Sequence, residues 1–211
     1  SGVSEQTLKV FKSQLADLGL QVMQAPMGSA SPDSKFKLEP GAPVSAVLMN
    51  GDFNISATGT VTYRKNDTIL AFGHPFLKYG SANFPMAGAE IITIVQSIAQ
   101  SFKLSNTGPL LGSIYQDRLT SIAGKIGPLP PLTPLSIRTR TANGTKRHFT
   151  GNIFEHPTLS PILTGIALME SLNSTLEAGE IQTFTIDGSI AIDGFAPIKY
   201  REIASGPKGA F

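Results

Sequence analysis

The stretch that decides the fold is NISATGTVTYRKNDTILAFGH, residues 54–74. Thr, Val and Ile dominate two short segments of this stretch, and the polar residues RKND at 64–67 separate them. Segments rich in β-branched residues on either side of a polar turn are typical of a β-hairpin. The stretch ends on Gly73 and His74, so one of the three histidines of the chain follows directly after a predicted strand.

The same pattern recurs further along the chain. Residues 110–127 predict a second hairpin that turns at 116–118. Residues 135–154 predict a third hairpin, in which Asn143-Gly144 is the signal of a two-residue type I′ turn. Other apolar and β-branched segments predict further strands at 20–25, 44–50, 90–98, 101–106, 180–194 and 197–203.

Two helices are predicted, near residues 4–18 and 158–177. Ser4 is a suitable N-cap for the first helix, and Thr158 or Ser160 can cap the second. Apolar residues recur at helical spacing in the first segment and give it one apolar face: Leu8, Phe11, Leu15 and Leu18.

The predicted order is a helix, many short strands, a second helix and more strands. This order indicates a mainly β fold, an antiparallel barrel or sandwich with two appended helices. It divides the chain into an N-terminal helix and linker, residues 1–37, and a β domain, residues 38–211.

The composition of the chain excludes several classes of partner and of functional site. The net charge is +2, from 17 basic and 15 acidic residues, and the basic residues look scattered, so neither nucleic acid nor an anionic membrane is indicated as a partner. The absence of cysteine excludes disulfides, thiolate metal sites and a cysteine nucleophile. No apolar run reaches the roughly 18 residues of a membrane-spanning helix. No phosphate-binding glycine motif occurs either, and no cofactor is predicted.

Three stretches stand out when they are taken together. They are PGAPVSAVLMNGDFNISATGTVTY at 40–63, ILAFGHPFL at 69–77 and GSIYQDRLTSIAGKIG at 112–127. The chain resembles the SpoIVB peptidase family of bacterial serine peptidases in these stretches, over residues 38 to 140. The specific feature is a Gly-Thr-Val-Thr-Tyr strand followed at this spacing by Phe-Gly-His-Pro.

The resemblance implies a chymotrypsin-like antiparallel β-barrel arrangement with a site of the Ser-His-Asp type. The family's histidine corresponds to His74. The family's serine lies in a Gly-x-Ser-Gly-Ser-Pro segment downstream of the histidine, and this chain contains no such segment. Two interpretations stay open: the chain stops before the nucleophile, or it belongs to a branch that kept the fold and lost the chemistry.

Two functions are therefore predicted. One is a binding or scaffold module of an exported bacterial protein, periplasmic or extracellular, whose partner is a peptide or another protein. The other is an active serine endopeptidase that uses His74 as general base with a serine that the sequence does not identify.

His74 is the leading candidate for a catalytic residue. A general base needs its imidazole within reach of a hydroxyl and an acceptor that fixes its tautomer. Gly73 and Pro75 hold it where the chain changes direction. The alternative is a structural role, in which the ring ties two loops together and its loss lowers stability.

Asp117 follows His74 in the order expected for the acid of a triad, although an aspartate in a turn commonly bonds its own backbone. Ser101 and Lys103 lie two apart on a predicted strand and can form a Ser-Lys dyad, but alternation on a solvent face explains them equally. Ser160, at a helix start, can serve an oxyanion site or simply cap the helix.

The other two histidines do not form a metal motif. His148 and His156 are eight residues apart, with Glu155 beside the second, and HExxH does not occur. No metal site is predicted. Four aromatic residues near His74 can line a substrate cleft or cap the core: Phe72, Phe76, Tyr79 and Phe84.

Overall fold

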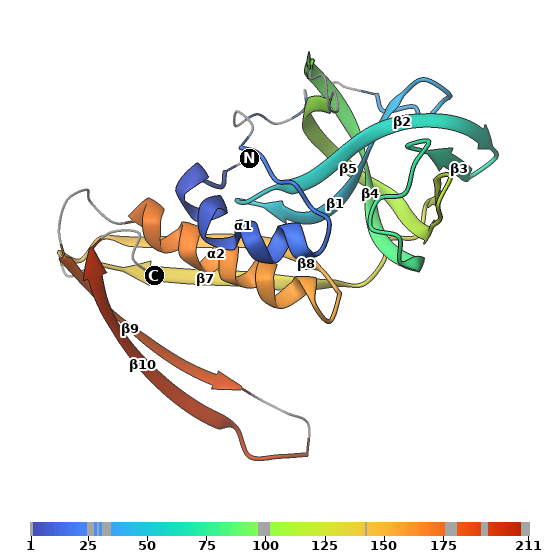
Figure 1. Cartoon of the computed structure of the whole chain (residues 1–211). Coiled ribbons are helices and arrows are strands. Elements are labelled where there is room, and N and C mark those ends of the chain that lie inside the picture. The colour runs from blue at the N-terminus through green and yellow to red at the C-terminus, as the bar shows by residue number, and fades with distance from the viewer. Residues whose placement is uncertain are drawn as a thin grey trace.

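The computed structural model describes residues 2–24, 28, 30, 35–96, 102–141, 143–175, 181–190 and 194–207. The fold is mainly β with two helices, as predicted (Figure 1). The elements are α1 (Glu5–Asp17), β1 (Pro43–Gly51), β2 (Ile55–Lys65), β3 (Thr68–Ala71), β4 (Gly80–Val95), β5 (Phe102–Asp117), β6 (Ile122–Ile126), β7 (Leu132–Arg140), β8 (Lys146–Phe154), α2 (Leu159–Thr175), β9 (Ile181–Ile190) and β10 (Ile198–Pro207).

Six strands of the larger sheet close into a ring in the order β1-β2-β3-β6-β5-β4. Each neighbouring pair is antiparallel, which confirms the antiparallel prediction. The ring closes at β1, which pairs with β2 along one edge and, through residues 44–46, with β4 along the other. The end of β1, at 49–51, pairs with β8, so the β7–β8 hairpin extends the sheet beyond the ring.

The hairpins predicted at 54–74 and 110–127 are confirmed as β2–β3 and β5–β6. The turn of the second was predicted at 116–118 and is wrong, because Gln116 and Asp117 still pair with Ala123 and Ile122 and the chain turns at 118–121. The third hairpin forms, but its turn differs from the prediction. β7 ends at Arg140, β8 begins at Lys146, and the Thr141 N–H donates to the Thr145 carbonyl. Arg140 pairs with Lys146 and Thr141 with Thr145, so the connection is longer than the two-residue type I′ turn at Asn143-Gly144, and that prediction is wrong.

Two other strand predictions are also wrong. Residues 20–24 form no strand, and 181–190 form one strand rather than a pair within 180–194. This strand, β9, pairs with β10 in a separate two-stranded sheet that extends away from the larger sheet (Figure 1). The hairpin turn therefore lies later in the chain than the pattern indicated.

The two helices cover the extension of the sheet rather than the ring. α2 packs against β7 and β8, and α1 packs against α2 (Figure 1). Leu159, Leu163 and Ile166 of α2 are fully buried in the core, and Leu8 and Leu15 of α1 join the same core. The segment predicted as helix and linker thus shares its core with the β domain. Neither helix of the described residues is long and apolar enough to cross a membrane.

A buried carboxylate joins the two helices. Ser4 is the N-cap of α1, as predicted, and its side chain accepts from the Thr7 N–H. Glu170 of α2 is only 7% exposed, and its Oε2 accepts from the Ser4 N–H at 2.9 Å, the Ser4 hydroxyl at 2.7 Å and the Thr7 hydroxyl at 2.6 Å. A carboxylate at a helix N-terminus also interacts favourably with the helix dipole.

Candidate functional site

The segment that carries His74 is a conformationally strained loop between β3 and β4. Phe72 and Lys78 have φ values of +76° and +62°, in the left-handed region that bulky side chains rarely occupy. Gly73, between Phe72 and His74, has a φ of +74°, at no comparable cost. Residues held in this region concentrate at functional sites, where the surrounding structure keeps them in place.

Asp117 holds this loop in place. Its side chain is at the end of β5 and is 1% exposed. Oδ1 accepts from the Phe76 N–H at 2.7 Å, and Oδ2 accepts from the Leu77 N–H at 2.6 Å. Both oxygens are therefore occupied by backbone amides of the loop, two and three residues beyond His74. The structure brings Asp117 to the His74 loop, but its contact is with the backbone.

His74 itself is exposed, and its Nδ1 lies 2.7 Å from the carbonyl oxygen of Pro75. Because a carbonyl oxygen only accepts, Nδ1 carries the proton of the neutral ring and Nε2 is left as an acceptor. Within the described residues, no serine or carboxylate is hydrogen-bonded to the ring. The predicted structural role, in which His74 ties two loops together, is wrong, because its partner is the adjacent residue and Asp117 makes the loop contacts.

An aromatic cluster connects His74 to a second histidine. Phe72 contacts both His74 and Phe76, with ring centroids 5.7 and 6.0 Å apart. Phe76 packs edge-on against Phe84 at 5.4 Å. The four aromatic residues predicted around His74 belong to this cluster, and Phe84 is fully buried, so they cap the core beneath the loop.

Sequence reasoning missed the far end of this cluster. Tyr79 stacks on His156 with centroids 4.7 Å apart and planes 10° apart, although 77 positions separate them. Phe154 contacts both Phe84 and His156. Burial, and then the Asp117 carboxylate, raise the pKa of Tyr79, which keeps its phenol neutral.

His156 also caps the N-terminal end of α2. Its carbonyl accepts from the Ser160 N–H, and its Nδ1 accepts from the N–H groups of Thr158 and Leu159 at 3.2 Å each. The Ser160 hydroxyl accepts from the His156 N–H at 2.8 Å. The predicted cap by Thr158 is wrong, and the Ser160 hydroxyl, besides accepting from His156, donates to the Phe154 carbonyl at 2.9 Å. Pro157 follows the cap directly, two residues before α2 begins at Leu159, and this His-Pro pair was the signal available in the sequence.

Acidification is expected to destabilise the protein through His156. Burial lowers the pKa of His156, so the unfolded chain binds the proton more readily than the folded chain. The stability contributed by the neutral ring is complete above about pH 6.5 and is lost as the pH falls from there through the lowered pKa. Protonation of Nδ1 also removes the two helix-capping hydrogen bonds. Melting temperatures measured between about pH 7.5 and pH 5 should show the loss.

His156→Asn separates this effect from general acid denaturation. Asparagine can cap the helix with its side-chain oxygen and does not titrate, so this variant should lose less stability on acidification than the wild type. His148→Asn, on the exposed face of β8, is the matched control and should behave like the wild type. Equal losses in the wild type and His156→Asn would show that another group is responsible.

The other residues considered as catalytic groups or metal ligands have different hydrogen-bond partners. Lys103 donates to the Thr60 hydroxyl on the inner side of the ring, and Ser101 lies outside the described residues. Nε2 of His148 is 2.9 Å from the Ser136 hydroxyl, while Glu155 accepts from Thr133. His148 and His156 thus have different partners, Ser136 for the first and the start of α2 for the second. No group of three potential metal ligands occurs among the described residues.

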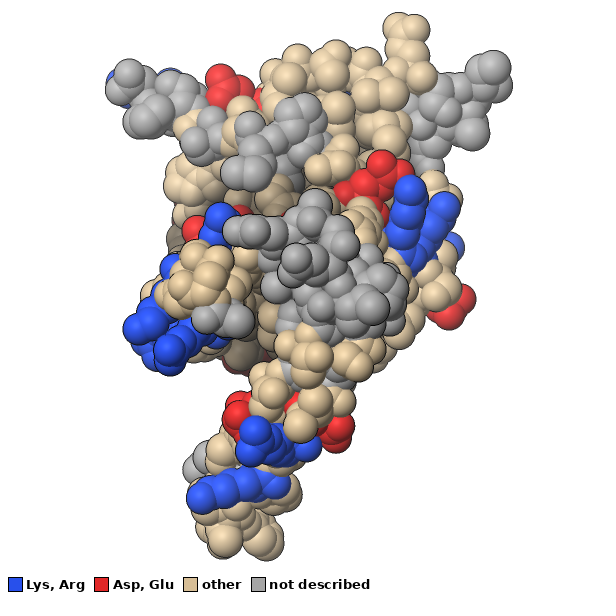
Figure 2. All heavy atoms as spheres, turned by 90° about the vertical axis from the view of Figure 1, so that its left-hand side faces the viewer, with Lys and Arg blue, Asp and Glu red and all other residues tan. Residues whose placement is uncertain are grey.

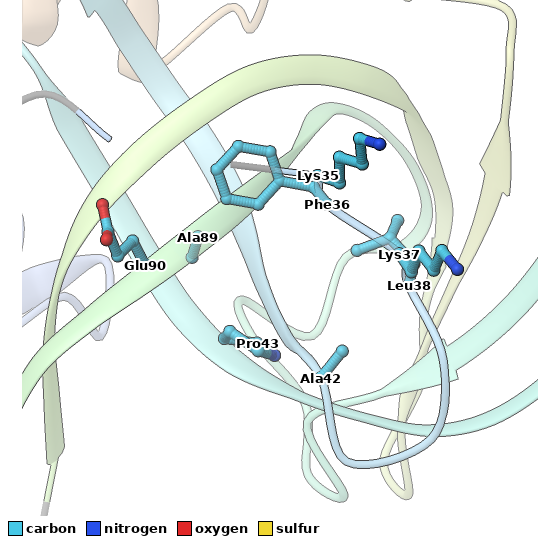
Figure 3. A pocket seen from close by; sticks show the side chains of 8 residues that line it. All are labelled: Lys35, Phe36, Lys37, Leu38, Ala42, Pro43, Ala89 and Glu90. Carbon is cyan, nitrogen blue, oxygen red and sulfur yellow. The ribbon is translucent and has the colours of Figure 1, made fainter. Parts of the chain in front are cut away.

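A hollow of about 260 Å³ lies elsewhere, between residues 35–43 and β4. The Phe36 ring packs against Gly88 and Gly108, where any larger residue would collide with it. Figure 3 shows Lys35 and Lys37 extending away from Glu90, so the charged groups around the hollow do not converge. This hollow is therefore a packing gap beside the Phe36 ring. The His74 loop remains the better candidate for a functional site.

Comparison of the chain with protein-family models, with curated proteins and with solved structures finds no match.

Proposed function

We propose that the chain is a SpoIVB peptidase-like domain of an exported bacterial protein, with a chymotrypsin-like strand arrangement, and that it binds a peptide or another protein without cleaving it. The three stretches that carry the resemblance fall on β1–β2, on β3 with the His74 loop, and on β5–β6, all within the ring. Asp117, from the third stretch, bonds the loop in the second. The three stretches that carry the resemblance thus lie next to one another in the ring, which supports the proposal.

The single observation that carries the non-catalytic function is the engagement of Asp117. Its two carboxylate oxygens accept from the Phe76 and Leu77 amides, while the His74 ring donates to the Pro75 carbonyl. A serine triad needs its acid on the imidazole and its imidazole on a hydroxyl. Neither contact is present among the described residues, so the loop is built as a rigid surface.

The second candidate function is a serine endopeptidase with His74 as general base. One observation favours it: the bond to the Pro75 carbonyl fixes the neutral tautomer with Nε2 as the free acceptor, on an exposed ring. A backbone carbonyl can orient a catalytic imidazole as a carboxylate does. The serine in this mechanism would come from outside the described contacts of His74.

A fluorophosphonate probe separates the two functions. We expect no serine of the chain to react, because within the part of the chain that the structure describes no hydroxyl is hydrogen-bonded to the His74 ring. Intact-mass measurement after incubation checks this, with His74→Ala and His148→Ala as paired variants. Labelling of one serine that disappears in His74→Ala but persists in His148→Ala would establish the peptidase instead, and would identify the nucleophile.

A further inference from the structure

The β7–β8 hairpin carries an unbalanced positive charge. Residues 132–154 contain no Asp or Glu and five basic side chains: Arg138, Arg140, Lys146, Arg147 and His148. The whole chain has 17 Lys and Arg and 15 Asp and Glu. Without the four Lys and Arg of this hairpin, the rest of the chain has 13 basic and 15 acidic residues. The expectation that basic residues are scattered is wrong here. Figure 2, which faces the end of the molecule where this turn lies, shows Lys and Arg gathered in separate clusters.

Four of these side chains share one face of the hairpin. Arg138 is directly opposite His148, and Arg140 is directly opposite Lys146. All four are exposed, and within the described residues none of the three Lys and Arg side chains makes an ion pair. Arg140 and Lys146 carry like charges directly opposite each other, which destabilises a strand pair. An anionic partner on this face would offset that repulsion.

The same hairpin has an open backbone edge. Within the described strands, β7 is the last in the sheet order and pairs with β8 alone. The Thr141 N–H donates to the Thr145 carbonyl, so odd-numbered residues of β7 point their backbone groups at β8. Even-numbered residues, including Ser136, Arg138 and Arg140, then present their N–H and C=O groups to the open edge.

Pro134 supports this assignment. It has the same parity as Arg138 and Arg140, so its missing N–H falls on the open edge and removes nothing from the ladder with β8. The part of the edge that retains its donors is therefore the part that carries the arginines.

We propose that the open edge of β7 binds an extended acidic peptide, which adds to the sheet as a further strand and places carboxylates beside Arg138 and Arg140. This inference rests on the proposed binding function and names its surface and its partner. Alternate residues of a strand are about 6.8 Å apart, so acidic residues at positions i and i+2 of the peptide match the two arginines. The unpaired N–H and C=O groups favour a peptide over a nucleic acid, because another backbone satisfies them.

Fluorescence anisotropy with the full chain and a labelled hexapeptide of alternating Val and Glu tests the proposal. Binding should weaken by about tenfold in the double variant Arg138→Glu/Arg140→Glu, where two attractions become repulsions. The matched control is Lys9→Glu/Lys12→Glu on α1, which makes the same change in net charge and should leave binding unaltered. Circular dichroism shows whether each variant is folded.

A second peptide separates strand addition from simple charge attraction. Methylation of the backbone nitrogens that face β7 leaves the charge unchanged and should abolish binding. Equal binding of the methylated peptide, or of a hexapeptide with three contiguous Glu residues, would overturn the proposal. So would tighter binding of a single-stranded oligonucleotide, or no peptide binding by the folded wild type. Failure of the folded wild type to bind the peptide would not show that the chain is a peptidase, because the fluorophosphonate experiment decides between the catalytic and the non-catalytic function.

Discussion

Replacing Asp117 with alanine is expected to lower the free energy of unfolding by about 3 kcal/mol, the largest effect of any single change at the candidate site. The carboxylate is buried and accepts from two amides, at 2.7 and 2.6 Å, which would otherwise be left without partners. The loop that it holds also contains two non-glycine residues with positive φ, which resist the native conformation. For a chain of this size the melting temperature should fall by roughly 6–12 °C.

Two further variants show which property of Asp117 matters. Asp117→Asn has nearly the same shape but turns an N–H₂ group toward one of the two amide donors, so it should lose most of the same stability. Asp67→Ala, at the exposed β2–β3 turn, is the matched control and should change the free energy of unfolding by less than about 0.5 kcal/mol. Urea denaturation measures all three. An Asp117→Ala variant as stable as the wild type would show that the loop does not depend on this carboxylate.

Replacing Glu170 with alanine is expected to cost roughly 2–3 kcal/mol. Its Oε2 accepts three hydrogen bonds from Ser4 and Thr7, across the α1–α2 interface. Removal of the carboxylate leaves these donors without their acceptor, and it removes the negative charge from the N-terminus of α1. The free energy of unfolding and the helical circular dichroism signal should fall together, because α1 loses its support.

A double-mutant cycle tests the mechanism behind this loss. Thr7→Val removes the hydroxyl that donates to Glu170 at 2.6 Å, and it should be destabilising in the wild type but much less so in the Glu170→Ala background. Glu5→Ala is the exposed control on the same helix, where only a surface ion pair with Lys9 is lost. Additive effects of Thr7→Val and Glu170→Ala would contradict a direct interaction between the two side chains.

Local sequence determined most of the secondary structure. The hairpins at 54–74 and 110–127 form because segments rich in apolar or β-branched residues flank short polar turns, and both signals lie within a few neighbouring residues. The N-cap at Ser4 has the same local origin. The errors were local as well: the turn at 141–145 is longer than Asn143-Gly144 indicated, and the cap of α2 lies two residues before the predicted Thr158.

The candidate site was only partly predictable. The sequence identified His74 and Asp117 as residues of interest, and the structure places both at one loop. Their partners could not be predicted, because a carboxylate bonds an imidazole or an amide equally well and the choice depends on angstrom-scale placement. The basic residues of the β7–β8 hairpin could be read from the sequence as RTRTANGTKRH. Only the strand register showed that four of them lie on the same face.

The sequence by itself determined a cysteine-free, mainly antiparallel β chain with two helices and a histidine after a strand. Tertiary structure alone decided that Asp117 holds the His74 loop, that Glu170 accepts from Ser4 and Thr7 at the start of α1 and that Tyr79 stacks on His156. The physical reason is the range of the interactions. Turns, caps and alternation act between residues a few positions apart, whereas these three contacts join segments that only the closure of the ring and the packing of the helices bring together.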